Sequence, residues 1–149
     1  MNGLSTDTQP RTGDVRSGSV EGPAQGASFF LLDQLDWADD RSTGAVPLTM
    51  LDEAELRGGG GRKLLAGGEG GFYSTYSVVP PGYVMAAHRH DYDELVIVLD
   101  GACAWSQGPV TTAGDSVVMP RGVVHGYRTG ADGMTLLTVA RGPFRTELV

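Results

Sequence analysis

The sequence contains little lysine and little cysteine. Lys63 is the only lysine among 149 residues, and 11 basic residues against 18 acidic ones give a formal net charge of −7 at pH 7. Domains that bind nucleic acid carry a basic patch or stripe, and no such stripe occurs here. We therefore expect no nucleic-acid partner, and the same acidity disfavours anionic membrane surfaces. Cys103 is the only cysteine, which excludes a disulfide within the chain.

Long apolar runs are also missing. No stretch approaches the ~20 apolar residues of a membrane-spanning helix, and residues 1–20 lack the apolar segment of a signal peptide. The sequence therefore predicts a cytoplasmic protein with no membrane contact. Residues 1–27 are rich in Ser, Thr, Gly, Pro, Asp and Gln, and such a segment cannot offset the entropy of ordering. We expect a disordered N-terminal arm at 1–27 and one domain at 28–149.

Glycine, by contrast, is abundant, at 23 of 149 residues. This favours strands and turns over helices, because glycine inside a helix costs ~1 kcal/mol relative to alanine. From residue 63 onward, short runs rich in β-branched and aromatic residues alternate with Gly, Pro and Asp. Asp100-Gly101 predicts a turn, and separate strands are predicted before and after residues 130–133. Six or more short strands predict an all-β sandwich or barrel.

The region before the strands is harder to interpret. Segments 28–37 and 46–56 carry apolar residues with a periodicity that fits a strand or a short helix. Four glycines at 58–61 precede Arg62 and Lys63. A phosphate-binding loop requires Gly-Lys-Ser/Thr at this point, and Arg62 interrupts that motif. We therefore expect a hairpin or a loop between strands.

Two of the three histidines, His88 and His90, are one residue apart, and Glu94 follows four positions later. Alternate residues of a strand share a face, so the two imidazoles are expected on one side, and Glu94 has the same parity. His125 comes from a later strand. If that strand lies beside the first, three imidazole nitrogens and one carboxylate oxygen converge, a donor set that suits a divalent metal.

The spacing around these residues resembles that of the cupins. Their first motif, G-x5-H-x-H-x3-E-x6-G, is matched from Gly82 to Gly101. Their second motif, G-x5-P-x-G-x2-H-x3-N, has Thr129 in place of its final asparagine and is otherwise matched at Gly114, Pro120, Gly122 and His125. The resemblance implies an all-β fold with a single cupin domain, that is, a double-stranded β-helix or jelly-roll barrel, with its strands at about 63–143.

The resemblance also implies a function. One divalent ion per chain would be held by His88, His90, Glu94 and His125; Fe(II) is favoured, and Zn, Mn or Ni are the alternatives. The implied activity is that of an enzyme on a small organic substrate, with Fe(II)-dependent dioxygenation, using O2, as the first expectation. Isomerase, lyase, decarboxylase or cyclase chemistry is the second. A non-catalytic, sensor-type module that binds a small molecule is the third.

Several aromatic residues are candidates for lining the pocket. Tyr127 has the parity of His125, and we expect it either to donate a hydrogen bond to substrate as a catalytic residue or to be an ordinary core aromatic. Weaker candidates are Tyr76, Tyr92, Trp105 and Met119. Cys103 is expected in the core rather than as a nucleophile.

Charged residues near the motifs have two interpretations each. Asp91 and Asp93 either fix histidine tautomers or are simply solvated. Arg121 either steers an anionic substrate at the barrel mouth or lies in a surface turn. Cupins commonly pair, so the resemblance also implies a homodimer, with an interface supplied by Phe29, Phe30, Leu31 and Trp37.

Overall fold

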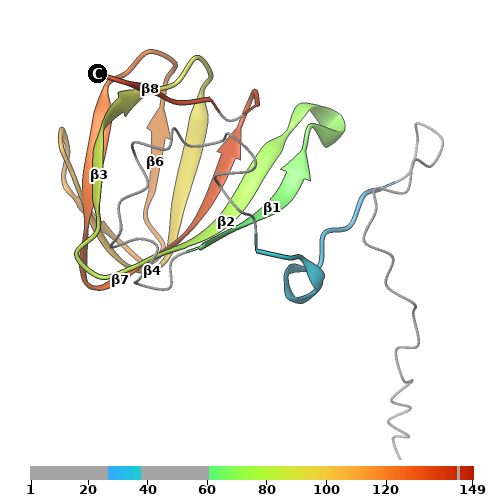
Figure 1. Cartoon of the computed structure of the whole chain (residues 1–149), viewed down its shortest axis with the longest axis horizontal. Helices are drawn as coiled ribbons and strands as arrows, with labels where there is room; N and C mark the ends of the chain where they lie inside the picture. Colours follow the sequence, from blue (N-terminus) through green and yellow to red (C-terminus); the bar gives the residue numbers. More distant parts are fainter. Residues whose placement is uncertain (1–26, 38–60, 144) are drawn as a thin grey trace, which may run out of the picture.

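The computed structural model describes residues 27–37, 61–143 and 145–149. The predicted arm, up to residue 26, and the segment 46–56 lie outside these residues. The strands are β1 (Gly61–Gly67), β2 (Tyr73–Val79), β3 (Val84–Arg89), β4 (Glu94–Trp105), β5 (Val110–Thr112), β6 (Ser116–Met119), β7 (His125–Ala140) and β8 (Glu147–Leu148). Two short 3-10 helices, η1 (Leu32–Gln34) and η3 (Glu69–Gly71), complete the described ranges, which hold no α-helix. The all-β prediction is confirmed (Figure 1).

The long strands β4 and β7 join two sheets into a barrel. β7 pairs with β3 over its first half and with β2 over its second half, while β4 runs antiparallel to both halves. One sheet therefore has the order β1-β2-β7-β4-β6 and the other the order β8-β3-β7-β4-β5. Figure 1 shows the resulting curled barrel, with the C-terminus beside the end of β3.

Both long strands bend where two glycines meet. Gly101 and Gly133 have φ of +76° and +77°, and a Cβ on Gly101 would lie 2.2 Å from the Gly133 carbonyl oxygen. Before the bend β4 buries its even-numbered residues up to Val98, and after it the odd-numbered Cys103. The turn predicted at Asp100-Gly101 is therefore wrong, because this glycine forms a bulge inside one strand. The two strands predicted around residues 130–133 are likewise one bent strand, β7.

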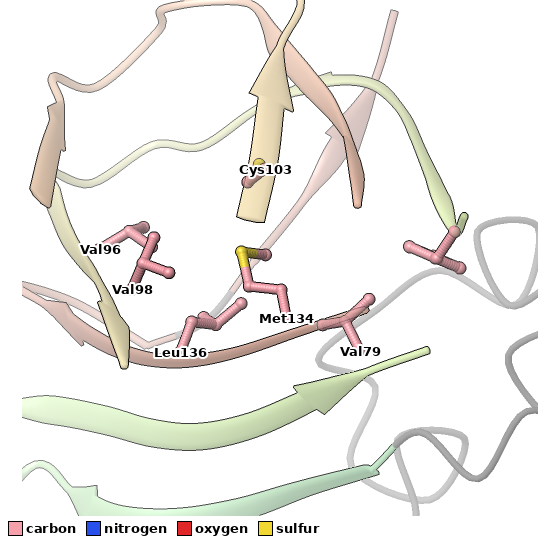
Figure 2. Packing of buried hydrophobic residues seen from close by; sticks show 7 residues of the cluster. Val79, Val96, Val98, Cys103, Met134 and Leu136 are labelled. Atoms are coloured by element: carbon pink, nitrogen blue, oxygen red, sulfur yellow. The ribbon is translucent and has the colours of Figure 1, made fainter. Parts of the chain in front are cut away.

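The apolar core lies inside the barrel near this bend. Figure 2 shows side chains from β2, β4 and β7 converging there. The cluster consists of Val79, Tyr83, Val96, Val98, Cys103, Met134 and Leu136. Full burial of an aliphatic side chain contributes about 1.5–3 kcal/mol, so this cluster is a main source of stability.

The segment 27–37 lies outside the barrel beside β1 (Figure 1). The Trp37 ring packs on Gly61, and the Lys63 ammonium lies 4.8 Å from the centre of that ring. Lys63 Nζ also donates a hydrogen bond of 2.9 Å to the Leu32 carbonyl. Within the described residues, no helix has the length and apolar character to cross a bilayer.

Candidate metal centre

The structure brings the three histidines together at one end of the barrel. His88, near the end of β3, is the register partner of His125, the first residue of β7, and His90 follows β3 directly. One ring nitrogen from each histidine lies within 4.8 Å of the others. Two ligands on opposite sides of an ion at ~2.1 Å would be about 4.2 Å apart, so the spacing of the three nitrogens is close to that of ligands sharing one ion.

Glu94, the first residue of β4, supplies a carboxylate to the same place. Its Oε1 lies 3.7 Å from His90 Nε2 and 3.6 Å from His125 Nε2. The Nε2 atoms of these two histidines therefore face the carboxylate. His88, Glu94 and His125 are only 4%, 8% and 5% exposed, so the group is shielded from water.

Backbone carbonyls hold the tautomer of each histidine. The Nδ1 atoms of His88, His90 and His125 lie 2.7, 2.9 and 3.1 Å from the carbonyl oxygens of Ala86, Arg145 and Val123. A carbonyl oxygen only accepts, so each Nδ1 carries the proton and donates it. Each Nε2 is left with a lone pair, as a metal ligand requires.

The protonation equilibria differ between the histidines. Burial lowers the pKa of His88 to about 4, although the Ala86 carbonyl opposes this effect. His88 is therefore neutral at pH 7. Burial also acts to lower the pKa of His125, but the Glu94 carboxylate and the Val123 carbonyl outweigh it, and the pKa is raised. A cation bound at this imidazole would therefore compete with a proton more strongly than at His88.

The chemistry of this donor set fits a divalent ion. Three imidazole nitrogens with fixed lone pairs and one carboxylate oxygen lie within reach of a single centre. The assignment of His88, His90, Glu94 and His125 as ligands remains a prediction.

Two turns position the strands that carry the ligands. In the first, Thr129 Oγ1 donates to the Pro80 carbonyl at 2.7 Å and accepts from the Tyr83 amide at 2.8 Å. Thr129, at the asparagine position of the second motif, thus fastens the turn that leads into β3. In the second turn, the Arg121 amide donates to Asp93 Oδ1 at 2.9 Å, which ties the loop after β3 to the turn before His125.

Tyr127 of β7 and Trp105 of β4 are register partners near the histidines, on the inner face of the barrel. Their ring centroids are 5.4 Å apart, and that of Trp105 lies 6.4 Å from that of His125. Tyr127 is two residues from His125, partly buried and packed against the core. Its role toward substrate remains a prediction. Tyr92 stacks on His90, with centroids 4.7 Å apart and planes at 15°.

The remaining candidates fall in different places. Met119 is the register partner of Glu94. Tyr76 pairs with Lys63 and Leu137, on the face opposite the buried Thr75 and Ser77, so the idea that it lines the pocket is wrong.

The other polar candidates can also be placed. Cys103 is fully buried in the core, and burial raises the pKa of its thiol to about 11. Arg121 lies in an exposed turn, and Asp91 is exposed.

The groups that fix the histidine tautomers could not be found from the sequence. They are the carbonyls of Ala86, Val123 and Arg145, and any residue type can supply a backbone carbonyl. The hydrogen bonds of Thr129 were missed as well. The single hint to them was the departure from the second motif at this position.

Comparisons with known proteins agree with this architecture. Residues 75–140 match the family model of the cupin domain, a range that contains the whole quartet. No functionally curated protein matches the sequence.

Solved structures are similar at low sequence identity. KdgF from Halomonas sp. has a TM-score of 0.57 and 19% identity, over 78% of this chain and 96% of that one. The polyketide cyclase RemF from Streptomyces resistomycificus has a TM-score of 0.52 and 25% identity, over 60% and 70%. A structure from work on the DMSP lyases RdDddP and RnDddQII has a TM-score of 0.57 and 19% identity, over 77% and 62%.

Proposed function

Since the chain is a small cupin, we propose that it is a metal-dependent enzyme acting on a small organic molecule. The observation that carries this proposal is the group of three buried or nearly buried histidines whose Nδ1 atoms are all held by carbonyls. Within a barrel, such polar groups cost free energy unless they are paired or bind an ion. One divalent ion bound by His88, His90, Glu94 and His125 would give each of these four buried polar side chains a partner.

Bound in this site, a divalent ion would supply Lewis-acid chemistry or, as Fe(II), oxygen chemistry. The chain itself contributes orientation and shielding. The three Nδ1–H donors fix the imidazoles, and Trp105 and Tyr92 pack beside them. Tyr127, on the same inner face as His125, would donate a hydrogen bond to substrate.

Two classes of reaction fit this site. Fe(II)-dependent dioxygenation, with O2 as co-substrate, is the expectation from the resemblance. The second class comprises isomerase, lyase, decarboxylase and cyclase reactions. One observation favours it, because among similar structures RemF is a polyketide cyclase and another comes from work on DMSP lyases.

Elemental mass spectrometry on the untagged full chain, purified without oxygen, tests the proposal. We expect near one metal ion per chain in the wild type and almost none in His88→Ala. Arg89→Ala is the matched control, since the neighbouring Arg89 contacts Glu147 on the surface and should leave the metal content unchanged.

The identity of the metal then directs the search for a reaction. Iron would direct it to O2 consumption, and Zn, Mn or Ni would direct it to the non-redox reactions. No metal in any sample, even after reconstitution, would overturn the proposal and favour a non-catalytic binding module.

We also propose that the protein is a homodimer. Phe29 is 84% exposed and Trp37 54% exposed, and Phe30 and Leu31 are exposed as well. Such a cluster of exposed apolar side chains is typical of an interaction surface. Light scattering should give twice the chain mass, and a monomer mass would contradict the proposal.

A further inference from the structure

The three histidines of the candidate metal centre differ in where their hydrogen-bond acceptors lie in the sequence. The Nδ1 atoms of His88 and His125 each face a carbonyl only two residues earlier in the chain. The acceptor of His90 Nδ1 is the Arg145 carbonyl, which is 55 residues away in sequence and 2.9 Å away in space. Two of the histidines are therefore oriented by their own local backbone, whereas the orientation of His90 depends on a distant segment.

That distant segment is residues 145–149, which include the short strand β8. β8 runs antiparallel to β3, with Glu147 opposite Arg89, and the Val149 amide donates to the Ala87 carbonyl at 3.2 Å. Hydrogen-bonded pairs alternate along an antiparallel ladder, so Glu147, two residues before Val149, also belongs to a hydrogen-bonded pair. The backbone of β8 is thus fastened to the end of β3, beside the histidines (Figure 1).

The side chains of this segment contribute little to its docking. Arg89 and Glu147 form an ion pair at 2.7 Å, but both side chains are exposed, and exposed ion pairs add little stability. Leu148 and Val149 are exposed as well, so little apolar burial supports the strand. Among the strands that the structure describes, β3 is the one partner of β8. Backbone pairing with β3 is therefore the main interaction that holds β8, and such a segment opens more readily than the core.

Residues 145 and 146 also contact other atoms around His90. Tyr92 stacks on the His90 imidazole. Burial raises the pKa of the Tyr92 phenol, and a hydrogen bond with the Arg145 backbone is among the interactions that oppose this rise. Thr146 Oγ1 lies 3.5 Å from His90 Nδ1. The backbone before β8 thus reaches both the imidazole and the ring that stacks on it.

We propose that the docking of β8 positions His90 as a metal ligand, so that metal binding and β8 docking stabilise each other. This inference rests on the proposed metal-dependent function. While β8 is paired, the Arg145 carbonyl accepts the Nδ1 proton and leaves the lone pair on Nε2. When β8 separates, the imidazole loses this acceptor, and both tautomers and other ring orientations become accessible. Coupling between two equilibria is reciprocal, so a bound metal ion favours the docked strand by the same factor.

Two substitutions of one residue test the positioning role. Glu147→Pro removes the side chain and the backbone N–H donor of β8, whereas Glu147→Ala removes the side chain alone. Competition with a chelator measures the Co2+ affinity of each full-length variant. The affinity should fall roughly tenfold or more in Glu147→Pro, because loss of a group that orients a ligand typically costs about 10–100-fold. Glu147→Ala should stay close to wild type, and an equal loss in both variants would overturn the role of the backbone pairing.

A spectroscopic readout separates positioning from a general loss of structure. The chain has three histidines, so NMR of the 15N-labelled imidazoles in the metal-free protein gives three sets of signals, and His90→Gln identifies those of His90. In Glu147→Pro we expect the Nδ1–H tautomer to be lost at His90 and kept at His88 and His125. Loss at all three histidines would mean a general disturbance and would overturn the proposal, and so would retention at His90.

Hydrogen exchange in the wild-type full chain tests the reciprocal effect. Bound Co2+ should slow exchange of the Val149 amide, which donates to Ala87, because the metal favours the docked strand. The Gly68 amide is the control, since it donates to the Phe72 carbonyl at 2.8 Å in the turn between β1 and β2. Its exchange should not change with metal. A Val149 amide that exchanges at the same rate with and without bound metal would overturn the coupling.

The metal content of the same samples separates the two proposals. A wild-type protein that holds one Co2+ per chain, with Glu147→Pro binding it as tightly, would overturn the role of β8 and leave the metal site standing. A wild-type protein that holds no metal would overturn the proposed function and this inference together.

Discussion

The two ends of the barrel interior are built from the same strands but from different chemistry. At the bend, β4 and β7 contribute Val98, Cys103, Met134 and Leu136, which pack into an apolar cluster. At the other end the same two strands contribute Glu94 and His125, which are equally buried but ionisable. Apolar burial stabilises the fold, whereas burial of polar groups without partners opposes it. The fold is thus stabilised mainly at the apolar end, and we expect the ionisable end to gain stability from a bound metal ion.

The largest effect should come from the metal itself. A metal that binds the folded state alone, at a thousand times its Kd, stabilises it by about 4 kcal/mol. Urea unfolding with and without metal should show this gain in the wild type and not in His88→Ala. Val98→Ala, at the apolar end, should lower the stability of both forms yet keep the gain. A metal-dependent gain that survives in His88→Ala would contradict the separation of the two ends.

Substitution of Gly101, at the bend of β4, should lower the stability of the fold by nearly as much. Gly101→Ala places a Cβ against the Gly133 carbonyl, at a φ of +76° that disfavours alanine. We expect a loss of about 3 kcal/mol in the free energy of unfolding, because backbone must move. Gly71→Ala is the matched control: its φ is +81°, but nothing lies within 4 Å of the added Cβ. It should lose only about 1 kcal/mol, and equal losses would show that the contact with Gly133 is not the cause.

A smaller effect is expected at the turn that leads into β3. Thr129→Val keeps the shape of the side chain but removes the hydroxyl that joins Pro80 and Tyr83. The Tyr83 amide then loses a buried acceptor, which should cost about 2 kcal/mol. Thr129→Ser retains the hydroxyl and should be much closer to wild type. Denaturant unfolding of the two variants measures the difference, and similar losses would assign the effect to the methyl group.

The two ends of the barrel, the apolar cluster at the bend and the end that carries the histidines, also differ in how much of their structure the sequence predicts. Strand parity, a local property, was sufficient to predict that His88 and His90 share a face, and the resemblance to the cupin motifs predicted that Glu94 and His125 join them. The alternation of strands and turns was sufficient for the all-β class. The division of the chain into 1–27 and 28–149 remains a prediction.

The bend was beyond the reach of local patterns. An Asp-Gly pair forms a hairpin turn or a bulge depending on what lies opposite, and here Gly133 lies opposite Gly101. That contact joins residues far apart in the sequence. Tyr76 was misplaced for a related reason, since the aromatic content of β2 did not show which face pairs inward.

A more gradual effect should appear in the pH dependence of the stability of the metal-free protein. His88 has a lowered pKa of about 4, so between pH 6.5 and 4 the unfolded chain binds a proton at this residue and the folded chain does not. Its contribution to stability is complete above pH 6.5 and is lost as the pH falls toward 4, by at most about 3 kcal/mol.

His125 has a raised pKa, so its contribution is complete below pH 6.5 and is lost as the pH rises above that value. The two residues together predict a maximum near pH 6.5 for the metal-free protein. Urea unfolding across pH 4–9 measures it, and His88→Gln should remove the decline on the acidic side. With metal bound, neutral imidazoles are required, so the maximum should move to higher pH and the metal should be released below about pH 6. An acidic decline unchanged in His88→Gln would mean that its cause lies outside the histidine end of the barrel.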